Sequence, residues 1–252
     1  MKDRNKFSVI EGGKKITSDN GAAGCPEADT LAGVAEASAV LLVSWQKEDG
    51  HWVFDLEADV TIPAEYVMLQ RFIGRSLPPG MESRLSSYIL ERQLPDGGWP
   101  LYAVDGDANI SASVKAYFAL KLLGHDKNAS HMVRARQLIL ALGGAAKCNV
   151  FTRITLALFG QVPWHTPPAM PIEIMLLPKW FFFHLSKISY WSRTVIVPLL
   201  ILYAKQPVCE LGYNDGISEL FTTPPDMLVH LDGFRPRAWR KNAFIMLDRV
   251  LK

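Results

Sequence analysis

The sequence has almost no net charge and few cysteines. Its 27 Lys and Arg residues nearly balance its 25 Asp and Glu residues, so the formal net charge is +2 with histidine neutral. A chain this close to neutrality gives no electrostatic reason to expect a nucleic acid as its partner. The three cysteines, Cys25, Cys148 and Cys209, are scattered without C-x-x-C spacing. They predict neither a zinc site nor a disulfide framework, and they fit a reducing compartment.

The sequence also lacks the patterns of several common sites. Its six histidines contain no H-x-x-x-H pair, and neither G-x-S-x-G nor a phosphate-binding glycine loop occurs. We therefore expect no metal site, no hydrolase nucleophile on a strand-to-helix turn and no nucleotide-binding loop.

No apolar run is long enough to cross a bilayer. The most apolar region, residues 170–204, is interrupted by four charged residues between Glu173 and Arg193. Its longest uncharged piece has about 11 residues, against the roughly 20 that a spanning helix needs. The first residues, Met1 to Lys6, are not followed by the apolar core of a secretory signal. A monotopic protein that rests on one leaflet is compatible with this pattern.

One motif occurs twice. Gln46, Gly50 and Trp52 have the spacing Q-x-x-x-G-x-W, and the same spacing recurs about 47 residues later in the segment QLPDGGW, residues 93–99. Each copy follows a run with helical periodicity, residues 35–45 and 83–92. A glutamine amide at the end of a helix can reach free backbone carbonyls, and the following indole can fold back onto it. The second copy comprises Gln93, Gly97 and Trp99. We expect both copies to tie neighbouring helices together.

The rest of the chain predicts helices and no convincing strand. Helical pairs at intervals of 40–50 residues favour an all-α fold, an α/α toroid. Residues 1–28, rich in glycine, lysine and small polar residues, predict a mobile tail, and 29–252 one domain that is incomplete at its C-terminal end. The expected helices are residues 31–45, 61–73, 83–92, one ending at Gly124, and 131–142, 150–159, 172–185, 189–204 and 237–252, with 208–225 as loop. Pro178 and Pro198 are expected to break or kink the helices over 172–185 and 189–204.

Together with these motifs, several segments resemble the N-terminal part of a squalene–hopene cyclase, a triterpene cyclase. The two copies match that family's QW motif, and the resemblance extends from about residue 30 to the C-terminus, over roughly the first third of such an enzyme. The matching segments are ADVTIPAEYVML (58–69), VKAYFALKLLG (114–124), VFTRITLALFGQVPW (150–164), PIEIMLLP (171–178) and SYWSRTVIVPLLILYAKQP (189–207).

The resemblance implies a particular chemistry. The family folds a squalene-like polyprene in an apolar cavity, protonates a terminal alkene with a strong acid, and guides carbocations past aromatic faces, without a metal or cofactor. The acid belongs to a D-x-D-D motif in the later two thirds of the enzyme, and this sequence has no D-x-D-D. The nearest run, Asp105-Gly106-Asp107, has the composition of a turn, and we assign it no acid role.

Two residues carry over by the resemblance. Glu65 matches a glutamate that helps to polarise the acid site through water, so it is the candidate auxiliary residue; otherwise it is a solvated first-turn glutamate. Trp191 matches a tryptophan that lines the substrate cavity; otherwise it is a core aromatic. The sequence departs from the family where Ile62-Pro63 replaces the usual Met-Glu and where Lys115 replaces a usual glutamate. These departures affect the electrostatics of the site rather than the fold.

The sequence is compatible with several interpretations of what the whole chain does. The resemblance implies the N-terminal segment of a squalene–hopene-type cyclase, inactive alone, on the cytoplasmic face of the cell membrane as a peripheral or monotopic protein. The alternatives are a non-catalytic remnant, a split subunit that docks on a separate C-terminal cyclase fragment, and a fragment of an oxidosqualene cyclase; a homodimer is also open. Because a partner barrel would be almost absent, we expect Leu41, Leu42 and Trp45 to be exposed.

Overall fold

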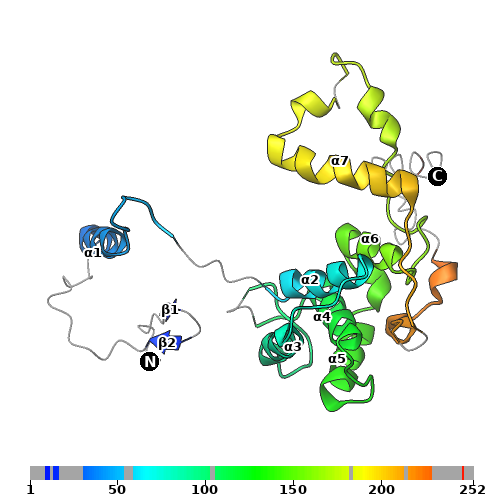
Figure 1. Cartoon of the computed structure of the whole chain (residues 1–252), viewed down its shortest axis with the longest axis horizontal. Coiled ribbons are helices and arrows are strands. Elements are labelled where there is room, and N and C mark those ends of the chain that lie inside the picture. The colour runs from blue at the N-terminus through cyan, green and yellow to red at the C-terminus, as the bar shows by residue number, and fades with distance from the viewer. Residues whose placement is uncertain are drawn as a thin grey trace. The chain divides into compact units, whose positions relative to one another are not determined.

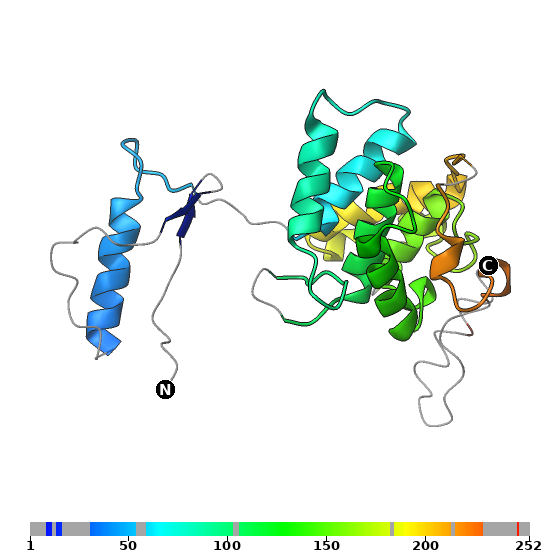
Figure 2. The same cartoon turned by 90° about the horizontal axis from the view of Figure 1, so that it is seen from below.

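The computed structural model describes residues 9–11, 14–16, 31–53, 59–102, 106–181, 184–212, 215–228 and 246. The chain divides into two compact units, Met1–Glu57 and Ala58–Lys252 (Figures 1 and 2). This division lies later in the chain than the boundary near residue 28 that the sequence suggested. The helix expected over residues 237–252 lies, apart from Met246, outside the described residues.

The N-terminal unit contains one helix and one short pair of strands. Helix α1, Leu31–Ser44, ends just before the first QW motif and has no buried residue. Leu41, Leu42 and Trp45 are 48%, 46% and 37% exposed, so the exposure expected for these three residues is confirmed. Strands β1, Val9–Glu11, and β2, Lys14–Ile16, pair antiparallel.

The strand pair was not expected from the sequence, because each strand is too short to show an alternating pattern. Its register places Val9 opposite Ile16 and Glu11 opposite Lys14. The sequence between the strands is Gly12-Gly13, a dipeptide common in two-residue hairpin turns. Outside this pair, the described elements are all helices and helical turns.

The second unit is a helical body built around α4. Ten of the 13 residues of α4 are buried, and α2, α3, α5 and the turn η1 pack against it. Ala112, Ala116 and Ala119 are fully buried, and their small side chains let neighbouring helices approach α4 closely. The helices are α2 Thr61–Phe72, α3 Met81–Glu91, α4 Ile110–Leu122, α5 Ser130–Ala141, α6 Val150–Leu158 and α7 Tyr190–Lys205. The 3₁₀ turns are η1 Ala145–Lys147, η2 Ile172–Leu176, η3 Leu185–Lys187, η4 Ser218–Leu220 and η5 Pro225–Met227.

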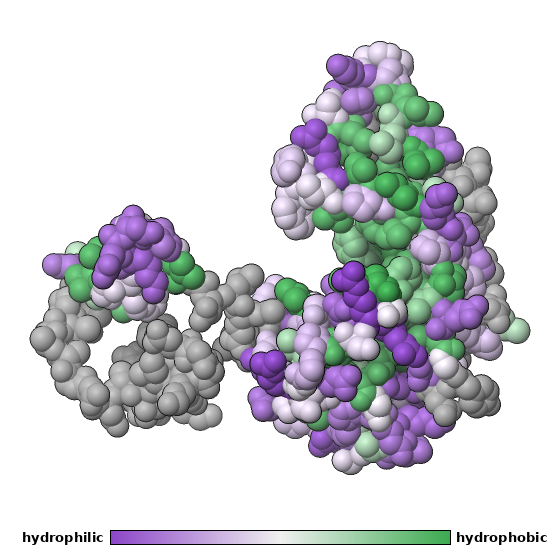
Figure 3. Space-filling view, in the orientation of Figure 1, coloured by the Kyte–Doolittle hydropathy of each residue, from purple (hydrophilic) through white to green (hydrophobic). Residues whose placement is uncertain are grey.

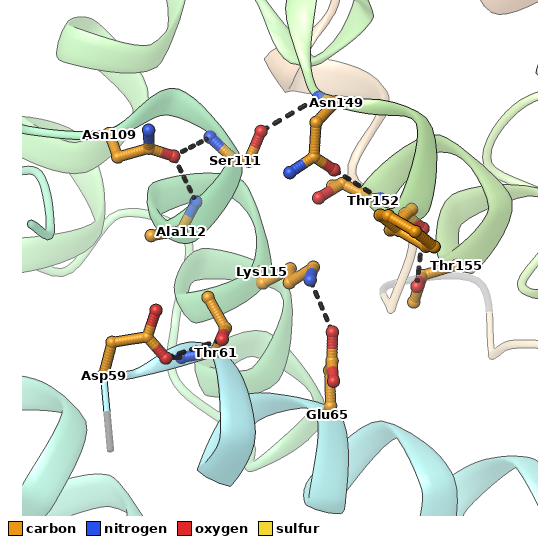
Figure 4. Close-up of polar contacts among 11 residues, drawn as sticks. Asp59, Thr61, Glu65, Asn109, Ser111, Ala112, Lys115, Asn149, Thr152 and Thr155 are labelled. Atoms are coloured by element: carbon orange, nitrogen blue, oxygen red, sulfur yellow. Dashed lines mark hydrogen bonds and ion pairs between the residues drawn. The ribbon is translucent and has the colours of Figure 1, made fainter. Parts of the chain in front are cut away.

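Asparagine side chains start two of these helices. Asn109 Oδ1 accepts hydrogen bonds from the backbone N–H groups of Ser111 and Ala112, at 2.9 and 3.1 Å, at the start of α4. Asn149 Oδ1 accepts one from Thr152 N at 2.9 Å at the start of α6 (Figure 4). Asn149 N in turn donates to Ser111 Oγ at 2.9 Å, which joins the beginnings of the two helices. Both caps satisfy backbone donors that the first turn leaves without a partner.

The helix expected over residues 172–185 is wrong. The structure has only the five-residue turn η2 there, followed by irregular chain up to η3 in its described part. The helical turn ends before Pro178, as the expected break there implies, because proline has no backbone N–H to donate and its ring disfavours the helical conformation of the preceding residue, Leu177. By contrast α7 continues through Pro198 as one helix and ends where Gln206 adopts a left-handed conformation, φ 45°. The loop expected over 208–225 is confirmed, with η4 as its short helical turn.

Candidate functional site

Both QW motifs have the same hydrogen-bonded geometry. In each, the glutamine lies two residues beyond the end of a helix, and its Nε2 donates to the carbonyl of the motif's glycine: Gln46 to Gly50 at 2.7 Å, and Gln93 to Gly97 at 2.8 Å. The indole folds back so that Nε1 donates to a carbonyl of the preceding helix ten residues earlier. These bonds run from Trp52 to Leu42 O at 2.6 Å and from Trp99 to Ile89 O at 2.7 Å.

The second copy also binds the helices that follow it. Gln93 Nε2 donates to the backbone carbonyl of His131 on α5 at 3.0 Å, and Trp99 N donates to Ser113 Oγ on α4 at 3.0 Å. Gly97 has φ +97°, and a Cβ atom there would lie 2.6 Å from the backbone carbon of Arg134. A side chain at this position would therefore be both strained and in collision with α5. The second copy thus joins α3, α4 and α5.

The first copy makes the same turn, and among the described residues it shows no second set of bonds like that of the other copy. Trp52 is 44% exposed, whereas Trp99 is fully buried. The hydrogen bonds described for Gln46, Gly50 and Trp52 all stay within residues 42–52. Gly50 also has a positive φ, +90°, but within the described part of the chain the one atom within 4 Å of a Cβ there is Gln46 Nε2 at 3.8 Å. The motif therefore forms locally, and the tertiary contacts are what differ between the copies.

Glu65 lies on α2 and pairs with a buried lysine. Lys115 Nζ, on α4, donates to Glu65 Oε1 across the contact between the two helices (Figure 4). The lysine side chain is 8% exposed, whereas the glutamate side chain is 49% exposed. One partner of this ion pair therefore belongs to the core, and the other opens onto the surface of the unit.

The surface around Glu65 is apolar. Ile62, Leu69 and Ile73 follow the helical spacing of Glu65 along one face of α2, and they are 57%, 53% and 46% exposed. Phe151 on α6 is exposed as well. We call the face formed by Ile62, Glu65, Leu69 and Ile73 the α2 stripe. It presents three large aliphatic side chains with one carboxylate among them.

Trp191 lies elsewhere, in the first turn of α7. It is 76% exposed beside the equally exposed Tyr190, so it is not a core aromatic in this structure. No hydrogen bond or ring contact joins it to Glu65 within the part of the chain that the structure describes. Apolar residues gather on the segment that carries α7 (Figure 3). Leu176 and Trp180, which precede α7 in the chain, are 83% and 80% exposed. The structure therefore leaves both predicted site residues exposed, one on α2 and the other on α7.

A polar cluster that the sequence did not suggest anchors residues 215–220 to α4. Glu219 Oε1 accepts hydrogen bonds from Lys121 Nζ at 2.5 Å and from Tyr117 Oη at 2.9 Å. Burial and the Glu219 carboxylate raise the pKa of Tyr117, while Lys121 and Tyr117 outweigh burial and lower the pKa of Glu219. No local signal could have revealed this cluster, because Tyr117 and Glu219 are 102 positions apart.

The remaining reactive side chains are packed rather than poised for chemistry. Cys148 is 3% exposed, and burial raises the pKa of its thiol to about 12, so this cysteine packs as a core residue. His125 Nδ1 lies 3.0 Å from His131 Nε2, and His125 Nε2 lies 2.8 Å from Ser86 Oγ, which links α3 to α5. Across the described ranges, no three His, Cys, Asp or Glu side chains are grouped so that they could hold a metal ion. None of the described helices has the length and apolar character needed to cross a membrane.

The fold and the two stapled turns define a class: α-helical repeat proteins in which Gln and Trp side chains close the turns between helices. Residues 34–252 match the family model for the squalene–hopene cyclase N-terminal domain. The chain belongs to the squalene–hopene cyclase family, and the α/α-toroid expectation is confirmed.

Curated relatives support this membership. A squalene–hopene cyclase of Zymomonas mobilis is 46% identical over 226 residues, 90% of this chain and 34% of the relative. A squalene–hopene cyclase of Schizosaccharomyces japonicus is 50% identical over 72% of this chain and 27% of the relative. One from Alicyclobacillus acidocaldarius is 35% identical over 79% of this chain and 32% of the relative. The chain thus spans about a third of the length of these relatives.

Proposed function

We propose that this chain forms the N-terminal part of the wall of an apolar cavity in which a squalene-like polyprene is cyclised through carbocations, as in hopanoid synthesis. In this proposal, the acid that starts the reaction comes from residues outside the 252 described by the sequence. This chain matches 34% and 27% of the length of two relatives named squalene–hopene cyclases, which leaves room for that acid.

The α2 stripe is the observation that carries this proposal. An aliphatic face that is about half exposed along three helical turns is costly in water, and burying it against apolar material is favourable by roughly 25 cal/mol per Å². A polyprene offers only hydrocarbon and alkene groups, so it satisfies such a face without leaving polar groups unpaired. Glu65, in the middle of the stripe, is the proposed auxiliary carboxylate.

The exposed aromatics of α7 support the second part of the proposal. The rings of Tyr190 and Trp191 are largely uncovered in the described structure. Aromatic faces attract positive charge through their quadrupole, and they do not remove protons from a carbocation as a basic group would. Rings in this position suit a reaction in which positive charge moves along a hydrocarbon chain.

The proposal predicts that the purified chain alone does not cyclise squalene. An ordinary carboxylic acid has a pKa of roughly 4.3 and protonates an isolated alkene far too slowly. The test is to incubate the chain with squalene in detergent, alone and with the C-terminal two thirds of the Zymomonas mobilis relative made as a separate polypeptide. Gas chromatography with mass spectrometry should find cyclic triterpene only in the mixture. Hopene made by the chain alone, above a protein-free control, would contradict the proposal.

Two variants sharpen this experiment. Trp191→Ala should lower product formation in the mixture, whereas Trp180→Ala, an equally exposed tryptophan outside α7, should leave it unchanged. Product from oxidosqualene but not from squalene would favour an oxidosqualene cyclase instead. A stable complex between the two polypeptides without any product would favour a non-catalytic remnant.

A further inference from the structure

The Glu65–Lys115 pair has an unusual arrangement for a charged pair. Its lysine lies in the core, on the most buried helix of the unit, while its glutamate lies on the exposed α2 stripe. A surface glutamate does not need such a partner, because water solvates it well. A buried ammonium does need one, since removing a single member of a buried pair leaves an uncompensated charge that is strongly destabilising. The pair is therefore held in place from the core side.

This arrangement decides the charge of the surface. Without Lys115, the α2 stripe would present one uncompensated carboxylate among Ile62, Leu69 and Ile73. An apolar face with a lone carboxylate favours amphiphiles that carry a positive headgroup. The hydrocarbon chain of such an amphiphile binds to the aliphatic side chains, and its headgroup then lies close to the carboxylate. With Lys115 in contact from below, the stripe as a whole is neutral, and this preference disappears.

We propose that Lys115 is a specificity-determining residue: by neutralising Glu65, it makes the α2 stripe select uncharged hydrocarbon ligands over cationic amphiphiles. This inference rests on the proposed function, since it concerns the ligand class of the same wall. It also makes Glu65 a fixed counter-ion in the resting chain. Lys115 acts through Glu65 and has no contact with the ligand.

Two probes with the same hydrocarbon chain test the inference. Dodecyltrimethylammonium carries a positive headgroup, and dodecyldimethylphosphine oxide carries none. Each is titrated into the full 252-residue chain below its micelle concentration. Binding is followed by NMR on isoleucine δ1-methyl groups, because Ile62 and Ile73 lie on the stripe itself. This readout separates binding at the stripe from binding to the exposed apolar residues near α7.

The wild-type chain should bind both probes with similar affinity. Lys115→Met should favour the ammonium probe on the order of tenfold, the ratio given by about 1.4 kcal/mol of charge–charge attraction. The double variant Glu65→Gln/Lys115→Met should lose this preference again, and it keeps the inference testable if the single variant folds poorly. Lys121→Met is the matched control: Lys121 is also on α4, also 8% exposed and also paired with a glutamate, but away from the stripe. It should leave the ratio unchanged.

The outcomes separate the inference from the proposed function. A wild-type chain that already prefers the ammonium probe tenfold, or a Lys115→Met chain without a new preference, would overturn the role of Lys115 and leave the cavity wall intact. If neither probe shifts the methyl signals of Ile62 or Ile73 in any variant, the wall itself is refuted, and the inference with it.

Discussion

Trp99→Phe should destabilise the second unit by about 1–3 kcal/mol, the cost of a buried polar group that loses its partner. The phenyl ring keeps most of the apolar contact but removes the Nε1–H that donates to Ile89 O at 2.7 Å. That carbonyl keeps one weaker bond, from Arg92 N at 3.3 Å, so the loss is not complete. Trp99 is fully buried, and the missing part of the indole leaves a void that adds to the cost.

The first QW motif supplies the matched control. Trp52 makes the same bond, at 2.6 Å to Leu42 O, and that carbonyl also keeps a second bond, from Trp45 N at 3.1 Å. Trp52 is 44% exposed, so water can replace the lost donor, and Trp52→Phe should cost less than about 0.5 kcal/mol. The two substitutions differ in burial rather than in chemistry.

The assay is urea unfolding followed by far-ultraviolet circular dichroism, which reports the helices and avoids the signals of the seven tryptophans. Thermal unfolding gives a second measure, with about 2–4 °C for each kcal/mol in a domain of 150–250 residues. Equal losses of stability in Trp99→Phe and Trp52→Phe would refute the reasoning, because the cost would then depend on the lost indole hydrogen bond alone and not on burial. No loss in Trp99→Phe would show that the second motif does not staple α3, α4 and α5.

Two further predictions concern the same unit. Burial lowers the pKa of both His125 and His131, so the unfolded chain binds more protons below the ordinary value of 6.5. Stability should therefore fall as the pH drops below about 6.5. In the wild type, the urea midpoint should be lower at about pH 5.5 than at about pH 8. The double variant with asparagine at both positions should reduce that difference. If the difference is unchanged in the variant, the two histidines are not the cause of the pH dependence. Asn109→Ala should cost about 1 kcal/mol because two backbone donors at the start of α4 lose their acceptor. The exposed Asn128→Ala is its control, and equal midpoints would rule out a role for the cap.

Local sequence was sufficient wherever the interactions are local. The Q-x-x-x-G-x-W spacing predicted a turn after a helix in both copies, because the Gln–Gly bond spans four residues and the Trp–helix bond spans ten. The extents of α2, α3 and α6 were also predicted closely from periodicity. The helix expected over residues 172–185 failed because the break expected at Pro178 is complete, so that the helical turn η2 ends at Leu176.

The family resemblance, rather than periodicity, pointed to Glu65 and Trp191. Nothing in the spacing of these residues distinguishes them from other glutamates and tryptophans on helices. The structure leaves both of them exposed, on α2 and on α7. Their predicted roles remain part of the proposal above.

Only the tertiary structure decided which QW motif is buried and which charged residues form pairs. The two motifs have the same local pattern, yet Trp99 is buried and Trp52 is not, because the partners of the second copy come from α4 and α5, at Ser113 and His131. The partner of Glu65 is likewise 50 positions away, on a helix whose burial follows from the packing of α2 and α5 around it. The sequence by itself determined the helices and their stapled turns, since bonds across a few residues form wherever the pattern occurs. Long-range contacts depend on how helices pack, and packing placed a buried ammonium beneath the one carboxylate of an apolar face.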